Sequence, residues 1–190
     1  MLRRFLMAVL GDRAGVVAIE AAFALPILCM MVFGMYETAQ AVICYYKLID
    51  AANSIADLIS QTTAASAGVG NTDFDNFYVA GQLIMSPNVG AGLKLDIASV
   101  NFSSNGKASI GWHVQRGGAS ATSNASLKAA TSTLVVNKGS VVVVQASYSY
   151  TSALNYFITS PISMTFQAFA IPRNVLQLDC PPTGSGESCS

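Results

Sequence analysis

The sequence predicts an α+β fold, in which a long N-terminal helix is followed by a short helix and an antiparallel β-sheet. Three observations support this. An apolar stretch of helical length covers residues 16–36, and apolar residues continue at helical spacing to residue 61. After Pro87 the pattern changes to the alternation that is typical of β-strands. Two helices followed by four or five antiparallel strands indicate an α+β exported domain.

Composition limits the class of protein. The chain has 190 residues, which allow one domain and a membrane anchor. It is 52% hydrophobic and only 11% charged, whereas about 25% charged residues is usual. This deficit favours a protein that lies partly in lipid. Ten basic and ten acidic residues cancel, and no basic stripe is present, so we expect no nucleic-acid partner.

The first element is a basic leader followed by a membrane helix. Arg3, Arg4 and Arg13 precede the apolar run, and the next basic residue is Lys47. A helix over residues 16–35 rises by about 30 Å, the thickness of bilayer hydrocarbon. The positive-inside rule places such an N-terminus in the cytoplasm. We therefore predict a cytoplasmic leader over residues 1–15, a transmembrane helix over residues 16–36 and export of the rest of the chain.

Two residues of this run, Glu20 and Pro26, are unusual in a membrane helix. Glu20 is an acid within it, and a carboxylate at the centre of a bilayer costs roughly 2.5–3.5 kcal/mol on insertion scales. A positive charge on another molecule would offset that cost; the simpler alternative is a side chain that reaches the membrane interface. Pro26 removes a backbone donor and crowds the preceding turn, so it predicts a helix kink.

Helical character is expected to continue through residues 37–61 as an amphipathic extension. No Gly or Pro occurs from Ala39 to Gln61. Apolar residues recur there at helical spacing: Val42, Ile43, Tyr46, Ile49, Ala52, Ala56 and Ile59. Polar residues fall largely on the other side: Lys47, Asp50, Asn53, Asp57 and Ser60. The whole helix of ~45 residues would measure about 65 Å.

Residues 62–190 are predicted to form a β-rich exported domain with a cysteine-containing tail. Residues 62–71 are small and polar and indicate a connector. Asp73 can cap a second helix that Ser86-Pro87 would stop. In the first strand, Leu93, Leu95 and Ile97 alternate before Val100 and Phe102 follow in the opposite phase, which predicts a bulge.

Turn residues then divide the strands. Asn105-Gly106 predicts a hairpin leading into a strand whose Ile110, Trp112 and Val114 share one face. Residues 117–131 are rich in Gly, Ala, Ser and Thr and predict a loop. Residues 134–136 and 141–151 predict a second hairpin, and residues 162–171 a last strand.

The residues that could perform catalysis are few. His113 is the sole histidine, and strand alternation places it opposite Trp112, partly exposed on the polar face. No Ser–His–Asp or Cys–His arrangement can be built around it. Gly68-Val-Gly70 lacks the following pattern and the basic residue of a phosphate-binding loop. We therefore expect neither an enzyme nor a cofactor.

The four cysteines fall into two groups. Cys180 and Cys189 flank a turn-rich segment, and an exported location would allow them to form a disulfide. Closing that loop is worth about 2.5 kcal/mol on the chain-entropy model. The alternative is two free thiols on a frayed tail. Their spacing matches no common zinc pattern, and Cys29 and Cys44 have no obvious partner, so no metal site is expected.

The N-terminal pattern resembles the processing signal of type IV prepilins: a basic leader, Gly15, four apolar residues, Glu20 and a hydrophobic stretch. Gly15-Val-Val-Ala-Ile-Glu20-Ala-Ala-Phe-Ala-Leu-Pro26, with Gly34-Met-Tyr-Glu37 downstream, is similar to the TadE-like family. That family comprises minor pilins or pseudopilins of the bacterial tight-adherence (Tad) secretion and pilus machinery. The resemblance covers residues 3–60, and the β-rich remainder agrees only in length, late strands and lack of catalytic residues.

The resemblance implies a role for each motif residue. A prepilin peptidase would cut on the cytoplasmic face after Gly15, so that Val16 becomes the N-terminus and Glu20 the fifth mature residue. Glu20 would pair with the new amine of a neighbouring pilin in the inner membrane. The Ala after Glu20 departs from the aromatic residue usual in major pilins and favours a minor subunit. The implied function is to initiate or prime pilus assembly for adherence, with the folded part periplasmic or extracellular.

Two other interpretations are open. Ala39-Gln-Ala41 is a small-x-small pattern at which an ordinary signal peptidase could cut, although the leader and the apolar stretch both exceed the usual lengths. The protein could also be an uncleaved single-pass protein with an exported binding domain. The N-terminal residue of the membrane form separates the three: Val16, Val42, or an intact start.

Overall fold

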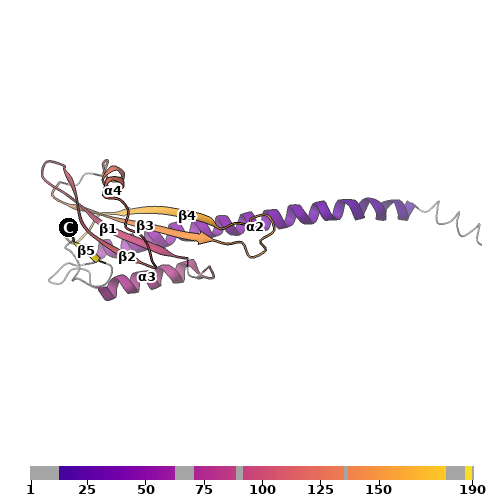
Figure 1. The fold of residues 1–190 in the computed structure, drawn as a ribbon, viewed down its shortest axis with the longest axis horizontal. Helices are drawn as coiled ribbons and strands as arrows, with labels where there is room; N and C mark the ends of the chain where they lie inside the picture. The colour runs from indigo at the N-terminus through magenta and orange to yellow at the C-terminus, as the bar shows by residue number, and fades with distance from the viewer. Residues whose placement is uncertain (1–12, 63–70, 89–91, 135–136, 179–186, 190) are drawn as a thin grey trace, which may run out of the picture.

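The computed structural model describes residues 13–62, 71–88, 92–134, 137–178 and 187–189. Its main element is α2 (Arg13–Gln61), a continuous helix of 49 residues. The C-terminal half of α2 lies along a β-sheet, whereas the N-terminal half projects from the folded part (Figure 1). The predicted long helix is therefore present. It continues through Pro26 without a break, and the kink at that residue stays a prediction.

The other elements form a layered α+β domain, as the sequence predicts. They are α3 (Asn71–Met85), β1 (Lys94–Phe102), β2 (Ala108–Arg116), α4 (Asn124–Ala130), β3 (Ser140–Tyr150), β4 (Ile162–Ala170) and β5 (Glu187–Cys189). The strand order is β4-β3-β1-β2-β5, and every neighbouring pair is antiparallel. α2 and α3 pack on one face of the sheet, and α4 lies on the other (Figure 1).

The packed half of α2 buries a face that overlaps the predicted one only in part: Ala52, Ala56 and Ile59 are buried as predicted. Its buried side chains are Glu37, Ala41, Cys44, Leu48, Ala51, Ala52, Ile55, Ala56, Ile59 and Ser60. Val42, Ile43 and Tyr46 are exposed, so the prediction that they belong to the apolar face is wrong. Small residues such as Ala41, Ala51 and Ala52 face the sheet because they let the helix approach it closely, and larger apolar side chains are left on the open side.

The predicted bulge exists, but it lies in β2. β1 pairs with β3 in unbroken register, while against β2 the register steps from Ser99↔Trp112 to Val100↔Ile110. Gly111 is thus the additional residue, and it turns the following side chains to the opposite face. Ile110 belongs to the cluster under α4, whereas Trp112 and Val114 lie in the core beneath α2 and α3. The prediction that these three share a face is wrong for Ile110.

Residues 117–131 contain a short helix that the sequence analysis took for a loop. The Ser123 hydroxyl accepts a hydrogen bond from the backbone N–H of Ser126 and so caps α4. Leu127 then fills the apolar cluster on that face of the sheet. The predicted hairpin turn at Asn105-Gly106 is confirmed by the antiparallel pairing of β1 and β2 around it, with Gly106 at φ +72°.

The second predicted hairpin is not formed as expected. β3 pairs with β1 and β4 instead of with a strand directly before it. Of the predicted first arm, residues 135 and 136 lie outside the described part of the chain. The last predicted strand is confirmed as β4, which is joined to β3 by residues 151–161. We call this connection the β3–β4 loop.

Candidate functional site

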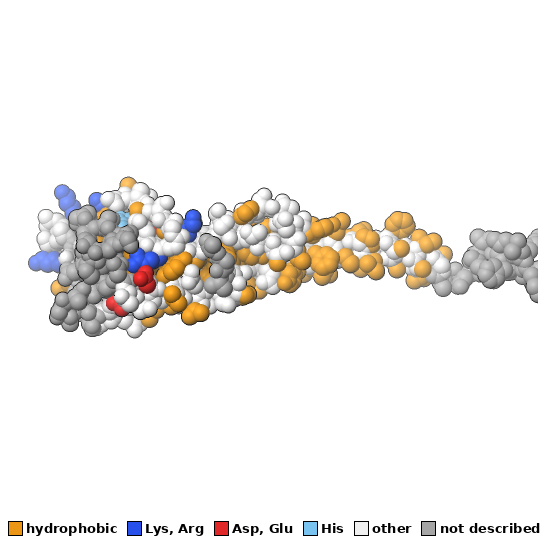
Figure 2. Space-filling view, turned by 60° about the horizontal axis from the view of Figure 1, so that its bottom comes forward, with side chains coloured by type: hydrophobic (Ala, Val, Ile, Leu, Met, Phe, Trp, Pro, Cys, Tyr) orange, Lys and Arg blue, Asp and Glu red, His pale blue; other side chains and the backbone are white. Residues whose placement is uncertain are grey.

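The projecting half of α2 is an apolar rod that the rest of the protein covers only at its C-terminal end. Val16 is 58% exposed and Phe23 75% exposed, and nearly all their neighbours up to Tyr36 are exposed as well. In the view of Figure 2, hydrophobic side chains cover much of the visible face of this part of the helix. Among the described residues, one helix is long and apolar enough to cross a bilayer, and it contains this segment. These properties fit a single-pass membrane protein.

The predicted motif residues lie at the start of this rod. Gly15, Val16 and Glu20 all belong to α2, and Val16 and Glu20 are exposed. A side chain added at Gly15 would meet nothing within 4 Å, so the fold of this chain does not require a glycine there. Four residues separate Val16 from Glu20, which is about one helical turn. The structure places these residues together without testing their roles.

A second acid on the same helix has a different environment. Glu37 is 1% exposed and lies where α2 first meets the folded part. Its carboxylate accepts three backbone hydrogen bonds from the β3–β4 loop: Tyr156 N–H at 2.8 Å, Phe157 N–H at 2.9 Å and Ile158 N–H at 2.8 Å. Hydrogen bonds to a charged acceptor are stronger than neutral ones. Glu37 therefore fixes this loop against the end of the apolar rod.

Gly34 stands one turn before Glu37 and allows the loop to approach. A Cβ at Gly34 would lie 3.4 Å from the ring of Phe157, so this ring covers the glycine closely. The Thr38 hydroxyl donates to the Gly34 carbonyl at 2.8 Å. The pair Gly34 and Glu37 was noted in the sequence only as part of a family pattern. Its structural role was missed, although an acid directly after a membrane-length apolar run is a signal that could have pointed to it.

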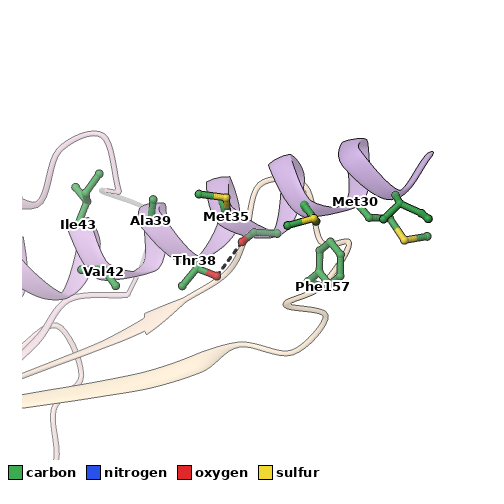
Figure 3. Close-up of a pocket in the computed structure, with 10 residues that line it drawn as sticks. Met30, Met35, Thr38, Ala39, Val42, Ile43 and Phe157 are labelled. Carbon is green, nitrogen blue, oxygen red and sulfur yellow. Dashed lines mark hydrogen bonds between the residues drawn. The ribbon is translucent and has the colours of Figure 1, made fainter. Parts of the chain in front are cut away.

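Two apolar grooves flank this contact. The larger has a volume of about 920 Å³ and runs along α2 beside Phe157, past Met30, Met35 and Val42 (Figure 3). The smaller, of about 380 Å³, lies between the helix and two loop side chains, Leu154 and Tyr156. Their linings are almost entirely apolar, so they suit acyl chains or apolar side chains better than a polar substrate.

His113 is buried, which corrects the expectation of a partly exposed histidine. It is 6% exposed, because α4 and the chain before it cover its face of the sheet. Its Nδ1 lies 3.3 Å from the Asp96 carboxylate, and its Nε2 lies 3.3 Å from the Asn124 side-chain oxygen. The backbone N–H of Thr122 also donates to Asp96, at 2.6 Å. The group therefore holds the start of α4 on the sheet.

The two charges in this group support each other. The hydrogen bond that His113 donates to the Asp96 carboxylate raises the pKa of His113 above its ordinary value, although burial opposes this. Burial alone would raise the pKa of Asp96, but hydrogen bonds from His113 and Thr122 outweigh it and lower that pKa. Among the described residues, no group of three or more His, Cys, Asp and Glu could hold a metal ion. We assign this cluster a structural role.

The structure brings no described cysteines together. Cys29 on the apolar rod and Cys44 beneath the sheet are both free thiols. Cys180 lies outside the described residues, and Cys189 is known by its backbone, which pairs with Trp112 as part of β5. The predicted Cys180–Cys189 disulfide stays a prediction.

The comparison with protein families bears on the apolar rod and its extension. Residues 15–57 match the family described as TadE-like protein. The matched part of α2 is thus similar to the TadE-like family. The matched segment begins at Gly15 and includes both Glu20 and the Gly34–Glu37 contact, so the resemblance noted in the sequence is confirmed. No curated protein and no solved structure matches the chain significantly.

The family match bears on the location of the protein, on its partners and on its class. The similarity of residues 15–57 to this family suggests an association with the Tad pilus and with a membrane, and it favours pilus-related partners. It also indicates a structural family and not a known family of enzymes. The sheet beyond residue 57 lies outside the match, so any specific role for that part has to be argued from its own residues.

Proposed function

We propose that this TadE-like protein is a minor pilin or pseudopilin-like subunit that helps to initiate or prime assembly of a Tad pilus for surface adherence. The observation that carries the proposal is the exposed apolar rod with Glu20 one turn from Val16. Such a surface needs lipid before assembly and neighbouring apolar helices afterwards. The folded domain, attached through the packed half of α2, would be displayed on the exported side.

The division of the chain follows from this role. We assign residues 1–15 to a cytoplasmic leader, residues 16–36 to the span of the bacterial inner membrane, residues 37–61 to its extension and residues 62–190 to the periplasmic or extracellular domain. A prepilin peptidase would cleave between Gly15 and Val16. The amine released on a neighbouring subunit would pair with Glu20, because an ion pair in a low-dielectric setting offsets the desolvation of each charge.

The N-terminal residue of the protein purified from membranes tests cleavage. Mass spectrometry should find Val16 at the N-terminus of the wild type and an uncut leader in Gly15→Leu. Because the fold leaves open space at Gly15, loss of cleavage in this variant reports on the peptidase and not on misfolding. A wild-type protein that starts at Val42 would indicate signal peptidase, and an intact start would indicate an uncleaved anchor with an exported binding domain.

Glu20→Ala tests assembly separately. We expect normal insertion and cleavage but strongly reduced incorporation into pili, measured by immunoblotting of sheared filaments. Ile19→Ala is the matched control, because it shortens an exposed neighbour on the helix without removing a charge. Unchanged piliation in Glu20→Ala would contradict the pairing of Glu20 with an amine.

A further inference from the structure

The β3–β4 loop has the composition of a membrane-contacting segment. Residues 151–161 contain no charged side chain. Leu154, Tyr156 and Phe157 are 47%, 58% and 51% exposed, although they are among the larger apolar residues of the domain. Tyr and Phe rings stacked edge to face, with centroids 5.2 Å apart, form the tip of this group. Exposed aromatic residues next to a membrane helix are typical of the bilayer interface.

The position of the loop along α2 strengthens this argument. Leu154 and Tyr156 share the smaller groove with Pro26, Met30 and Phe33. Those helix residues belong to the apolar run assigned to the membrane, and from Pro26 to Phe33 the helix rises by about 10 Å. If α2 crosses the bilayer in this register, the loop lies at the same depth as these helix residues.

Entry into lipid requires that backbone polar groups be satisfied within the protein. The loop meets this requirement in the segment that carries its aromatic side chains. The N–H groups of Tyr156, Phe157 and Ile158 all donate to the carboxylate of Glu37. The same bonds offset much of the cost of placing Glu37 at the membrane surface, because the acid is enclosed by its donors.

We propose that the β3–β4 loop enters the lipid leaflet beside α2 and acts as a second membrane anchor that Glu37 holds in place. Its occupant is the acyl-chain region of the bilayer, and the grooves beside Phe157 and Tyr156 are filled by lipid before assembly. The anchor fixes the tilt and rotation of the folded domain relative to the membrane. This inference depends on α2 crossing a bilayer and does not depend on the proposed role in a pilus.

Fluorescence quenching by brominated acyl chains tests the anchor in the full chain. The protein is placed in vesicles of phosphatidylethanolamine and phosphatidylglycerol, with Tyr156→Trp as the probe. Native Trp112 is 1% exposed within the core and gives a constant background. We expect brominated lipids to reduce the emission of the added tryptophan by about twofold, as for a ring at the membrane interface.

Leu176→Trp is the matched control. Leu176 is 72% exposed, and its carbonyl bonds to Ser140 at the opposite end of β3 from the loop. We expect no added quenching there. Equal quenching, or none, at both positions would overturn the proposal. Quenching at position 156 that disappears as the protein-to-lipid ratio rises would also overturn it, in favour of a second copy of the chain as the occupant.

Glu37→Gln in the Tyr156→Trp background tests whether Glu37 holds the β3–β4 loop in place. The amide offers one acceptor oxygen in place of the carboxylate, so the three donors can no longer all be satisfied. We expect weaker quenching at position 156 while the emission of Trp112 shows that the core persists. Unchanged quenching would overturn the role of Glu37 in holding the loop in lipid.

Discussion

The two halves of α2 both carry large apolar side chains, but they have different surroundings. The half up to Tyr36 is exposed on nearly all sides, whereas the half after Glu37 buries one face under the sheet. In the packed half the buried positions are largely small, and in the exposed half large side chains such as Phe23 and Leu28 face outward. Hydrophobicity alone therefore does not tell whether a helix is covered by its own chain, by lipid or by another subunit.

The largest expected effect comes from truncating equivalent leucines in the two halves. Leu48 is fully buried and Leu28 is 59% exposed. Leu48→Ala should lower the free energy of unfolding by roughly 2–5 kcal/mol because it leaves a cavity in the core. Leu28→Ala should change it by less than about 0.5 kcal/mol. Denaturation in detergent, followed by Trp112 fluorescence, measures both; similar losses would abolish the distinction between the halves.

A change of pH should have a smaller effect on the free energy of unfolding. We expect it to act through His113 and Asp96 in the folded domain and not through the exposed half of α2. Because the pKa of His113 is raised in the folded state, its contribution to the free energy of unfolding is complete below about pH 6.5. That contribution is lost as the pH rises through the folded-state pKa. The lowered pKa of Asp96 means that its contribution is present above about pH 3.9 and is lost as pH falls through the folded-state value. Stability from this pair should therefore be greatest between these limits.

Asp96→Asn checks the assignment. It removes the charge while keeping the shape, and it should cost roughly 1–3 kcal/mol near pH 5.5, with less loss at pH 8.5 because a smaller fraction of His113 is protonated there. Thermal unfolding at the two pH values measures the difference. The control is Asp50→Asn, which removes a charge from an exposed part of α2. Gln145→Glu is not a suitable control, because Gln145 forms a hydrogen bond with Gln167. An equal loss at both pH values would mean that the two charges are not coupled.

The smallest effect is expected at the junction of the two halves. A methyl group at Gly34 would meet the Phe157 ring at 3.4 Å, an ordinary contact. Gly34→Ala should therefore leave stability nearly unchanged, whereas Gly34→Leu should displace the ring and expose the amides of the β3–β4 loop. Hydrogen exchange of residues 156–158 is the measurement, and equal protection in both variants would show that the loop does not depend on close approach to Gly34.

Sequence reasoning was reliable where a pattern is local. The length of the apolar run predicted α2, the alternation after Pro87 predicted the strands, and Asn105-Gly106 predicted their turn. It failed where the answer depends on what packs against an element. The predicted apolar face of α2 omitted buried residues such as Ala51, Leu48 and Ile55. Similarly, α4 depends on Leu127 and the Ser123 cap within a segment that resembles a loop.

The candidate site divides in the same way. Gly15 and Glu20 could be selected from spacing along the chain, because their pattern lies within a single helix. The role of Glu37 could not, since its donors lie more than a hundred residues away in the β3–β4 loop. The face of His113, opposite Trp112, was predicted correctly, but its burial was not, because the α4 segment that covers it was itself taken for a loop.

The unbroken course of α2 has a mechanical consequence. The helix runs for 49 residues, or about 74 Å, from the apolar rod into the core of the folded domain. Between Ala39 and Gln61 it contains no glycine or proline that would act as a hinge. A force that lifts or turns the helix at Ala39 is therefore transmitted to the sheet as a rigid-body displacement of the whole folded domain.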